Sequence, residues 1–548
     1  MLLQTVHHMS GQSLTTGEYL VRLLESYGVD LIFGIPGVHT VELYRGLPAT
    51  KIRHVTPRHE QGAGFMADGY ARVTGKPGVC FIVTGPGMTN IATAMGQAYA
   101  DSVPMLVISA VNARDQLAMG QGRLHELPSQ RNLVAGVAAF SHTLLDPDQL
   151  PEVMARAFTV FNSQRPRPVH IEIPLDVIVA PADHLSSEAW PLPAKAAASG
   201  AAIEKAAGIL KAAKRPLIVA GGGAADAAAE IAAIAGKLDA PVFTTINGRG
   251  ILEPGHPLAL NGNLGMAPLL AELAASDAIL AIGTEFGETE MYPEPQPLKF
   301  GGPLIRIDID PLQLAAGLRC DLPIAADAKL AAAALLAALG EARPAGEGKA
   351  RASAVRAKVE EGLWPACRTH GRLMDIVTRT LPQAVVAGDQ TEPVYAVNQF
   401  YQAPQPRSYF NSSTGYGTLG YGLPAAFGAK LGAPDRPSVC LIGDGGLQFS
   451  LQEMASAVEA KIATVVIIWN NTSYGEIKAF MADRDIPQIG VDIFTPDFVG
   501  LSRALGCAAA LPETIEELTR ELTASSGRQV PTVIEIRAGS PLALALAQ

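Results

Sequence analysis

Short β-branched runs alternate with helical stretches three times along the chain. The strand-like runs include "LIFGIPG" and "GVCFIVTGPG" in the first third, "RPLIVAGGG" and "AILAIG" in the middle, and "SVCLIGDGG" and "ATVVIIWNN" in the last. Near-continuous apolar strands separated by helices are typical of parallel sheets that are covered on both faces. The sequence therefore predicts an α/β protein with three doubly wound parallel-sheet domains. In such folds ligands lie at the carboxyl ends of the strands.

Two linker-like stretches divide the chain. Residues 180–200 are rich in Pro, Ser and Ala, and residues 340–352 combine charges with Gly and Pro. A chain of 548 residues is too long for one hydrophobic core, whereas three domains of about 150–200 residues would each have a core of ordinary size. We therefore predict domains at residues 1–180, 195–340 and 355–548.

Composition argues against several classes of protein. Acidic residues outnumber basic ones by 52 to 42, a net charge of −10, which does not favour nucleic-acid binding. No apolar run reaches the roughly 18 residues of a membrane-spanning helix, so no membrane association is expected. The N-terminus lacks the basic and apolar regions of a signal peptide. Five cysteines without C-x-x-C spacing predict reduced thiols in a cytoplasmic protein.

The segment "GDGGLQFSLQEMASAVEAKIATVVIIWNN" carries an oxygen ligand at each end of a helix–strand unit. We predict a strand, a turn, a helix and a strand at residues 438–442, 443–446, 449–461 and 463–469. Asp444 and Asn471 would then emerge at the carboxyl ends of neighbouring strands. Carboxylate and carboxamide oxygens suit Mg²⁺, which usually shares its shell with substrate phosphates. Backbone N–H groups at a glycine-rich helix N-terminus suit the phosphates themselves.

Each half of this pattern has an ordinary explanation when it stands alone. Gly-Asp-Gly is a common turn, and Asn-Asn is a common loop. The joint pattern, with strand, helix and strand in between, favours a site for Mg²⁺ and phosphate.

Glu60 is the second candidate for chemistry. It lies in "RHEQGAGFMADGYARVTGKPGV" among small residues, and "TGPG" follows at residues 84–87. A single glutamate is usually a surface residue. A glutamate packed among small residues can instead exchange a proton in a water-poor site.

These segments resemble the thiamine-diphosphate-dependent superfamily of acetolactate synthases and 2-oxo acid decarboxylases. Further matches occur in the same order over nearly the whole chain, among them "FGIPG", "AYADSVPMLVIS", "RPRPVHIEIPLDV", "RIDIDP" and "GYGTLGYGLPAAFGAK". The resemblance implies a pyrimidine-binding domain, a central domain and a diphosphate-binding domain. It implies thiamine diphosphate and Mg²⁺ as cofactors.

The resemblance also implies roles for individual residues. Asp444, Asn471 and the backbone carbonyl of Ser473 would hold Mg²⁺. Glu60 would hydrogen-bond the aminopyrimidine ring and so promote formation of the C2 ylid. Leu419 aligns with the bulky apolar residue that supports the bent cofactor, a role compatible with plain packing. Further cofactor contacts are expected at Gly37, Thr84, Gly443, Gly445 and Gly446.

In this superfamily the glutamate and the metal motif of one site come from different subunits. The resemblance therefore implies at least a homodimer, and usually a homotetramer. Some relatives also bind FAD in the central domain, near the places of residues 219–230 and 283–290. A bare glycine turn is weak evidence for a flavin, and we do not expect FAD here.

Departures from the better-known branches narrow the resemblance. Val38 replaces the acidic residue of pyruvate decarboxylases, and Leu124-His125-Glu126 replaces the Phe-Gln-Glu of acetolactate synthases. The chain is most similar to the 5-guanidino-2-oxopentanoate (2-ketoarginine) decarboxylases of arginine catabolism. That likeness implies decarboxylation through an enamine, giving 4-guanidinobutanal and CO₂. The alternative is an acetolactate synthase-like carboligase.

A guanidinium substrate needs carboxylates that can meet its fork of donors. Glu476 is the first candidate because it lies just past the predicted metal residues, and Glu126 and Glu392 are alternatives. Each of the three could equally be a solvated glutamate. His125 is the candidate for proton transfer to the substrate, with a packed core histidine as the alternative. A non-catalytic cofactor-binding protein is disfavoured because Glu60, Asp444 and Asn471 are all present.

Overall fold

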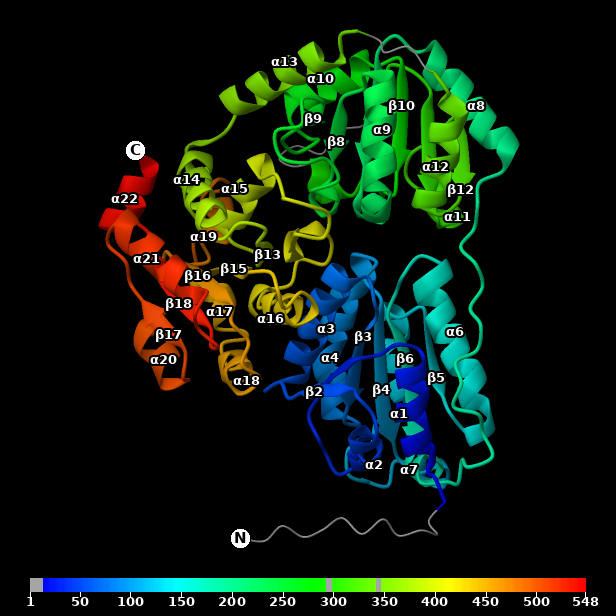
Figure 1. Ribbon diagram of the computed structural model, residues 1–548. Helices are drawn as coiled ribbons and strands as arrows, with labels where there is room; N and C mark the ends of the chain where they lie inside the picture. Colours follow the sequence, from blue (N-terminus) through cyan, green and yellow to red (C-terminus); the bar gives the residue numbers. More distant parts are fainter. Residues whose placement is uncertain (1–12, 292–297, 342–345) are drawn as a thin grey trace.

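The protein is built from three parallel sheets of six strands each (Figure 1). The computed structural model describes residues 13–291, 298–341 and 346–548. All strand pairs within the three sheets are parallel. The predicted α/β class with three doubly wound domains is confirmed.

The first and third sheets share one topology. Their strand orders are β2-β1-β3-β4-β6-β5 and β14-β13-β15-β16-β18-β17, so the third repeats the first strand for strand. The strands of the first sheet are β1 (Leu31–Gly34), β2 (Arg53–Val55), β3 (Gly78–Ile82), β4 (Met105–Val111), β5 (Phe140–Thr143) and β6 (Val169–Pro174). Those of the third are β13 (Val385–Gly388), β14 (Tyr409–Asn411), β15 (Ser438–Gly443), β16 (Val465–Asn470), β17 (Ala508–Ala510) and β18 (Thr532–Arg537).

The middle sheet has the order β12-β11-β10-β7-β8-β9, in which the strand order reverses beside β7. Its strands are β7 (Pro216–Ala220), β8 (Val242–Thr244), β9 (Ala259–Leu260), β10 (Ala278–Ile282), β11 (Leu304–Asp308) and β12 (Leu322–Ala325). The helices around it are α8 (Gly200–Ala212), α9 (Ala228–Leu238), α10 (Ala267–Ala275), α11 (Pro311–Ala315), α12 (Ala328–Leu339) and α13 (Gly348–Glu361).

Helices cover both faces of the first sheet because its central strands β1 and β3 are apolar on both faces. On β3, Val79 and Phe81 pack into a cluster with the buried face of α1, whereas Cys80 and Ile82 pack into a second cluster with α3 and α4. The helices of this domain are α1 (Thr16–Ser26), α2 (Val41–Tyr44), α3 (Glu60–Thr74), α4 (Pro86–Ala100), α5 (Gln130–Val134), α6 (Leu150–Ser163) and α7 (Leu175–Ile178).

The first and third domains share a hydrophobic core through α3 and α16 (Gly422–Gly432), which lie side by side in Figure 1. Glycines allow this close approach. A Cβ added at Gly69 would lie 1.9 Å from the carbonyl oxygen of Ala425, and one added at Gly428 would lie 1.9 Å from the carbonyl oxygen of Met66. The small residues around Glu60 therefore serve helix packing.

The predicted metal motif folds as expected in its strands but differently in its helix. β15 and β16 are hydrogen-bonded neighbours, as predicted. The expected helix over 449–461 is wrong in its bounds. Residues Asp444–Leu447 form the short α17, and the longer helix α18 spans Glu453–Glu459. The other helices of this domain are α14 (Pro365–Thr380), α15 (Glu392–Phe400), α19 (Gly475–Ala482), α20 (Phe498–Ala504), α21 (Ile515–Ser525) and α22 (Pro541–Ala547).

Among the described residues, none of the helices combines the length and the apolar character that crossing a membrane requires.

Candidate active site

Asp444 and Asn471 lie at the carboxyl ends of two adjacent strands. Gly443 and Trp469 are register partners in the β15–β16 pair, so both polar residues follow at the same edge of the sheet. The Asp444 side chain is 2% exposed, and burial raises the pKa of its carboxyl. Its Oδ2 atom is buried without a hydrogen-bond partner. Because a buried carboxylate oxygen is costly to leave unsatisfied, this atom suits a ligand cation.

The loop after β16 curls around the Asn471 carboxamide. Asn471 Oδ1 accepts hydrogen bonds from the backbone N–H of Ser473 at 3.1 Å and from its hydroxyl at 3.2 Å. Thr472 between them adopts a left-handed φ of 56°. Asp444 and Asn471 follow adjacent strands at one sheet edge, and with the Ser473 carbonyl they would make an all-oxygen set. Such a set fits Mg²⁺ that shares its shell with a diphosphate.

The motif glycines are required by packing, whatever they do for phosphates. A Cβ added at Gly445 would lie 2.6 Å from the Tyr474 ring, and one at Gly446 would lie 2.9 Å from Asp389 Oδ1. One added at Gly443 would lie 3.0 Å from the Thr391 hydroxyl. The turn after β15 therefore lies close against its neighbours only because these positions lack side chains.

Glu60 opens α3 and is 9% exposed. Its Oε2 accepts a hydrogen bond of 2.9 Å from the Asn90 amide on α4. A Cβ added at Gly87 would lie 3.4 Å from Oε1. No hydrogen bond within the described residues joins Glu60 to Asp444 or Asn471. The carboxyl group is thus held in a confined place with one oxygen available to a ligand.

The turn from Thr84 to Gly87 lies between Glu60 and His125 and packs against both. The Thr84 hydroxyl is buried without a partner. Gly85 has a φ of 71°, and a Cβ there would lie 2.8 Å from the carbonyl oxygen of His125. The buried Gln130 accepts the Gly85 N–H at 2.9 Å and fixes the turn.

His125 contacts a histidine that the sequence interpretation missed. Its ring meets the His39 ring edge-on, with 5.0 Å between the centroids and an interplanar angle of 87°. The Nδ1 atoms of both rings are buried without partners. Burial, and then the charge of His125, lowers the pKa of His39. His125 also holds a left-handed φ of 60°, a strained conformation for histidine. The sequence signal that could have identified His39 is its position two residues after Pro36-Gly37, on a loop at the end of a strand.

The structure separates the three carboxylates considered for a guanidinium. Glu126 binds its own loop, because its two oxygens accept the backbone N–H groups of Gly120 at 2.6 Å and Arg123 at 2.9 Å. These backbone donors, that of Arg123 first, lower the pKa of Glu126. Glu126 is thus already engaged within residues 120–126.

Glu392 and Glu476 lie near each other at the ends of two helices. Glu392 begins α15, and its Oε1 lies 3.0 Å from Nε2 of the fully buried His370. Glu476 is in the first turn of α19 and has an exposed side chain. Partial burial raises the pKa of Glu476, and the carboxylates of Glu392 and Asp483 raise it further. Negative charge is thus gathered at this point, a few residues past the candidate metal residue Asn471.

Leu419 and Gly37 occupy loops at the edge of their sheets. Leu419 is half-buried in the loop between the short 3₁₀ turn Ser412–Thr414 and α16. Gly37 follows β1, where its N–H donates to the Thr40 hydroxyl at 3.0 Å. Both lie where a ligand at strand carboxyl ends would meet them.

In the glycine turn after β7 of the middle domain, neighbouring residues fill the space beside the glycines. A Cβ added at Gly221 would lie 2.2 Å from the Gly283 carbonyl oxygen, and one added at Gly222 would lie 2.9 Å from the Asn247 side chain. These glycines are explained by packing between two strand-end turns. They carry no argument for a flavin, and the absence of FAD stays a prediction.

Family comparisons match all three domains. The N-terminal, central and C-terminal domain models of the thiamine pyrophosphate enzymes match residues 14–133, 203–335 and 389–536. The chain belongs to the thiamine pyrophosphate enzymes. Thiamine pyrophosphate is another name for thiamine diphosphate, so the predicted superfamily is confirmed.

Individual relatives match most of the chain. A probable 2-ketoarginine decarboxylase of Pseudomonas aeruginosa is 49% identical over 96% of this chain and 94% of its own length. The large subunit of acetolactate synthase isozyme 1 of Escherichia coli is 34% identical over 84% of this chain and 82% of its own length. An acetolactate synthase large subunit of Corynebacterium glutamicum is 32% identical over 92% of this chain and 84% of its own length.

Proposed function

We propose that this thiamine-diphosphate enzyme decarboxylates 5-guanidino-2-oxopentanoate, giving 4-guanidinobutanal and CO₂ in arginine catabolism. The observation that carries the proposal is the pair of carboxylates, Glu392 and Glu476, beside the candidate metal residues. The 49% identity with a probable 2-ketoarginine decarboxylase supports it. The bound cofactor would supply the electron sink into which the 2-oxo acid releases its CO₂.

The chain's own residues would bind and orient the reactants. Asp444, Asn471 and Ser473 would hold Mg²⁺ and, through it, the diphosphate. Glu60 would exchange a proton with the aminopyrimidine ring, with Asn90 fixing the carboxyl. His125 would deliver the proton that releases the aldehyde, because an imidazole is the usual acid and base near neutral pH.

Glu476 and Glu392 would recognise the guanidinium. Partial burial raises the pKa of Glu476, and repulsion by the carboxylates of Glu392 and Asp483 raises it further. A guanidinium between Glu476 and Glu392 would relieve that repulsion and supply donors to both. An uncharged side chain of the same length would leave the repulsion in place. The pair therefore favours a cationic substrate over a neutral one.

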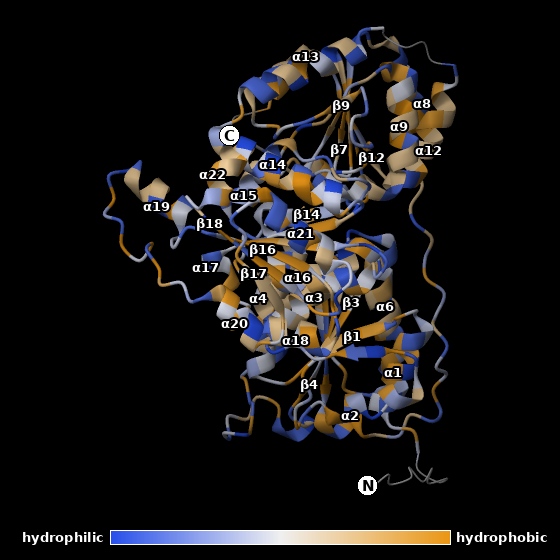
Figure 2. Cartoon of the chain, turned by 60° about the vertical axis from the view of Figure 1, so that its left-hand side comes forward, coloured by the Kyte–Doolittle hydropathy of each residue, from blue (hydrophilic) through white to orange (hydrophobic). Residues whose placement is uncertain are grey.

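We further propose that two subunits share each site, in a homodimer or a homotetramer. Glu60 binds Asn90 rather than any metal residue of its own chain, which leaves it available to a partner's cofactor. In addition, α19 and the segment after it extend away from the body and expose apolar side chains (Figure 2). A second subunit would cover both.

The test is CO₂ release from a panel of 2-oxo acids in the presence of thiamine diphosphate and Mg²⁺. The panel contains 5-guanidino-2-oxopentanoate, pyruvate, phenylpyruvate and 2-oxohexanoate, which has a neutral chain of similar length. The proposal expects the guanidino acid to be turned over with the highest kcat/KM. A higher kcat/KM for 2-oxohexanoate would overturn it.

Glu476→Gln sharpens this test. A charge-assisted hydrogen bond at an exposed carboxylate contributes about 1.5 kcal/mol, so the variant should lose about tenfold in kcat/KM for the guanidino acid. It should lose little for 2-oxohexanoate. Glu516→Gln is the matched control, because Glu516 is likewise exposed in the first turn of a helix, α21, but is not among the site candidates. Equal losses for both substrates would instead assign Glu476 to catalysis.

A carboligase is the second candidate, favoured by the identity of 34% with an acetolactate synthase. Incubation with pyruvate alone separates the two activities. Accumulation of acetolactate would establish the carboligase, whereas the decarboxylase proposal expects little turnover of pyruvate.

A further inference from the structure

Residues 412–421, which we call the cofactor loop, connect β14 to α16 and contain Leu419. The loop takes its course from glycines, since Gly417 and Gly420 have φ angles of 76° and 80°. Its C-terminal end is fixed by its own domain. The buried Asp389 accepts the N–H of Gly422 at 2.9 Å, at the start of α16. At the N-terminal end, Asn411 of the same domain accepts the Ser413 N–H at 3.0 Å, and a residue of a different domain adds a second contact.

Asp101 of the first domain holds that N-terminal end. The Thr414 hydroxyl lies 3.0 and 2.9 Å from the two oxygens of its carboxylate, and 3.2 Å from the Asn411 carbonyl oxygen of its own domain. Asp101 caps the C-terminus of α4. Gly415, which follows Thr414 in the cofactor loop, packs against the same end of this helix. A Cβ added at Gly415 would lie 2.9 Å from Ala100 Cβ and 3.0 Å from Asp101 Oδ1. Gly96, one turn earlier, faces the ring of Tyr416.

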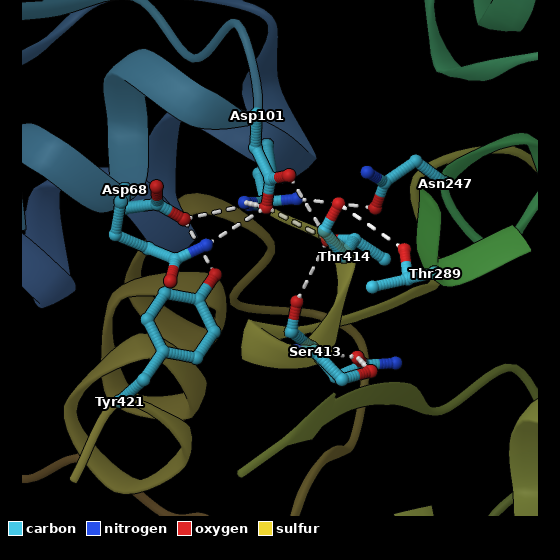
Figure 3. A network of polar contacts seen from close by, with 10 residues as sticks. Asp68, Asp101, Asn247, Thr289, Ser413, Thr414 and Tyr421 are labelled. Atoms are coloured by element: carbon cyan, nitrogen blue, oxygen red, sulfur yellow. Dashed lines mark hydrogen bonds and ion pairs between the residues drawn. The ribbon is translucent and has the colours of Figure 1, made fainter. Parts of the chain in front are cut away.

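The charge balance around Asp101 explains why it needs the threonine. Asp68 and Asp101 share one guanidinium, that of Arg72, at 2.6 and 2.5 Å (Figure 3). All three side chains are almost completely buried. Two carboxylates with one cation leave an excess negative charge, which must be met by neutral donors. The Gln97 amide at 2.9 Å and the Thr414 hydroxyl supply them to Asp101.

The middle domain reaches the same junction. Asn247 accepts the remaining Arg72 donor at 3.2 Å, and the Thr289 hydroxyl lies 3.4 Å from the Thr414 carbonyl oxygen (Figure 3). The two hydroxyl contacts to Thr414 differ in strength. The hydrogen bond that Thr414 donates to the Asp101 carboxylate is short and involves a charge, whereas the one that Thr414 accepts from Thr289 is long and neutral, so the contact with Asp101 is the stronger.

We propose that Asp101 is a positioning residue for the cofactor, acting through Thr414 on the loop that carries Leu419. The first domain of a chain then sets how tightly the third domain of the same chain holds thiamine diphosphate. The inference rests on the proposed cofactor role of Leu419. It deepens that role by naming the group outside the diphosphate-binding domain that fixes the loop.

The test compares three variants by the Kd for thiamine diphosphate in excess Mg²⁺, measured by calorimetry, and by the Tm of the protein without cofactor. Thr414→Val keeps the size of the side chain and removes the hydroxyl, so the Kd should rise about tenfold. Thr414→Ser keeps the hydroxyl and should restore the Kd to within about twofold. Thr289→Val removes the weak contact and should bind like the wild type. The Tm values of all three should agree within about 2 °C, since the ion pairs of Arg72 remain.

A Kd for Thr414→Val within twofold of the wild type would overturn the proposal. An equal rise for Thr289→Val would also overturn it, because general loosening of the junction would then suffice. If Thr414→Val proves too unstable to measure, Thr414→Ala removes the same hydroxyl: a Kd within twofold of the wild type decides against the proposal, and a rise of about tenfold that Thr414→Ser does not show decides for it. Failure of the proposed function is a separate result, since it would be seen as tight cofactor binding without turnover of the guanidino acid.

Discussion

At the scale of single residues, we expect different residues of the candidate site to serve cofactor binding and proton transfer. Glu60→Gln should keep thiamine diphosphate bound and lose most of the turnover, because an amide cannot exchange the proton that the carboxyl is placed to exchange. General acid–base steps contribute about 10²–10⁴-fold, and a loss of that size is expected in kcat. Calorimetry checks retention of the cofactor, and CO₂ release checks the rate. A variant with more than half of the wild-type activity would remove Glu60 from the mechanism.

Asp444→Ala should give the opposite pattern. The unpartnered Oδ2 of Asp444 is the atom best placed to meet a cation, and its loss leaves the charge of the diphosphate poorly compensated. We expect the variant to lose Mg²⁺-dependent retention of the cofactor on gel filtration. Asp435→Ala is a matched control, since Asp435 is an exposed aspartate just before β15, at the opposite end of that strand from Asp444. Equal retention by Asp444→Ala and the wild type would contradict the metal assignment.

Glu453 is a buried carboxyl whose charge should appear in the pH dependence of stability. Burial raises the pKa of Glu453 to about 7 from an ordinary value of 4.5. The native state therefore keeps a proton that the unfolded chain loses between about pH 4.5 and 7. Stability from this group is present below pH 4.5 and is lost as the pH rises through 7, by about 3 kcal/mol in total.

Glu453→Gln removes this dependence. The amide changes the contact with the Arg58 N–H, which the Glu453 carboxylate accepts at 3.0 Å, but that effect does not vary with pH. The Tm of the wild type relative to the variant should therefore fall by about 5–10 °C between pH 5 and pH 8, at about 2–4 °C per kcal/mol. Glu459→Gln, on the solvent-exposed end of α18, controls for surface charge. Parallel Tm curves for Glu453→Gln and the wild type would show that Glu453 stays ionised throughout.

At the scale of helices and strands, the contact between α3 and α16 depends on glycine. Gly69→Ala would place a methyl group 1.9 Å from the carbonyl oxygen of Ala425, so one of the two helices must move. Overpacking of this kind costs about 1–3 kcal/mol. Gly208→Ala in α8 is the matched control, because nothing lies within 4 Å and the change should stabilise by about 1 kcal/mol. The prediction is a lower Tm for Gly69→Ala and a higher Tm for Gly208→Ala.

The sequence predicted strands better than helices, and the reason is physical. The apolar runs that became β15 and β16 bury both faces, so they are recognisable without knowledge of neighbours. The helix between them depends on tertiary contacts. Asp389 and the Tyr474 ring crowd Gly446 and Gly445, and the chain turns again before α18 begins at Glu453. No local pattern reports such contacts.

The same limit applied to the candidate site. The spacing between Asp444 and Asn471 predicted that they share a sheet edge, because adjacent parallel strands end together. The contact of His39 with His125 joins segments 86 residues apart in sequence. The engagement of Glu126 with its own loop also required the fold, since both donors are backbone N–H groups. Spacing alone identifies partners within one strand–helix–strand unit and misses those between units.

At the scale of the whole molecule, the described surface exposes apolar side chains where a second subunit is expected. Ile489 and Phe494 follow α19 and are 77% and 85% exposed, and Ile477 and Phe480 on α19 are about half exposed. Such a group on one extended segment (Figure 2) is unusual for a monomer and typical of a buried interface. The segment also follows Glu476, so its partner would close the substrate side of the site.

The double variant Ile489→Asp/Phe494→Asp should therefore sediment as smaller species than the wild type in analytical ultracentrifugation. Two charges buried in an interface without partners cost several kcal/mol, which is enough to dissociate a dimer at micromolar concentration. Leu312→Asp is the matched control, because Leu312 is 79% exposed on α11 in the middle domain, away from α19. The control should keep the wild-type mass and activity, whereas the double variant should lose activity together with mass. A wild type that sediments as an active monomer would show instead that Glu60 and Asp444 of one chain form the site without a partner.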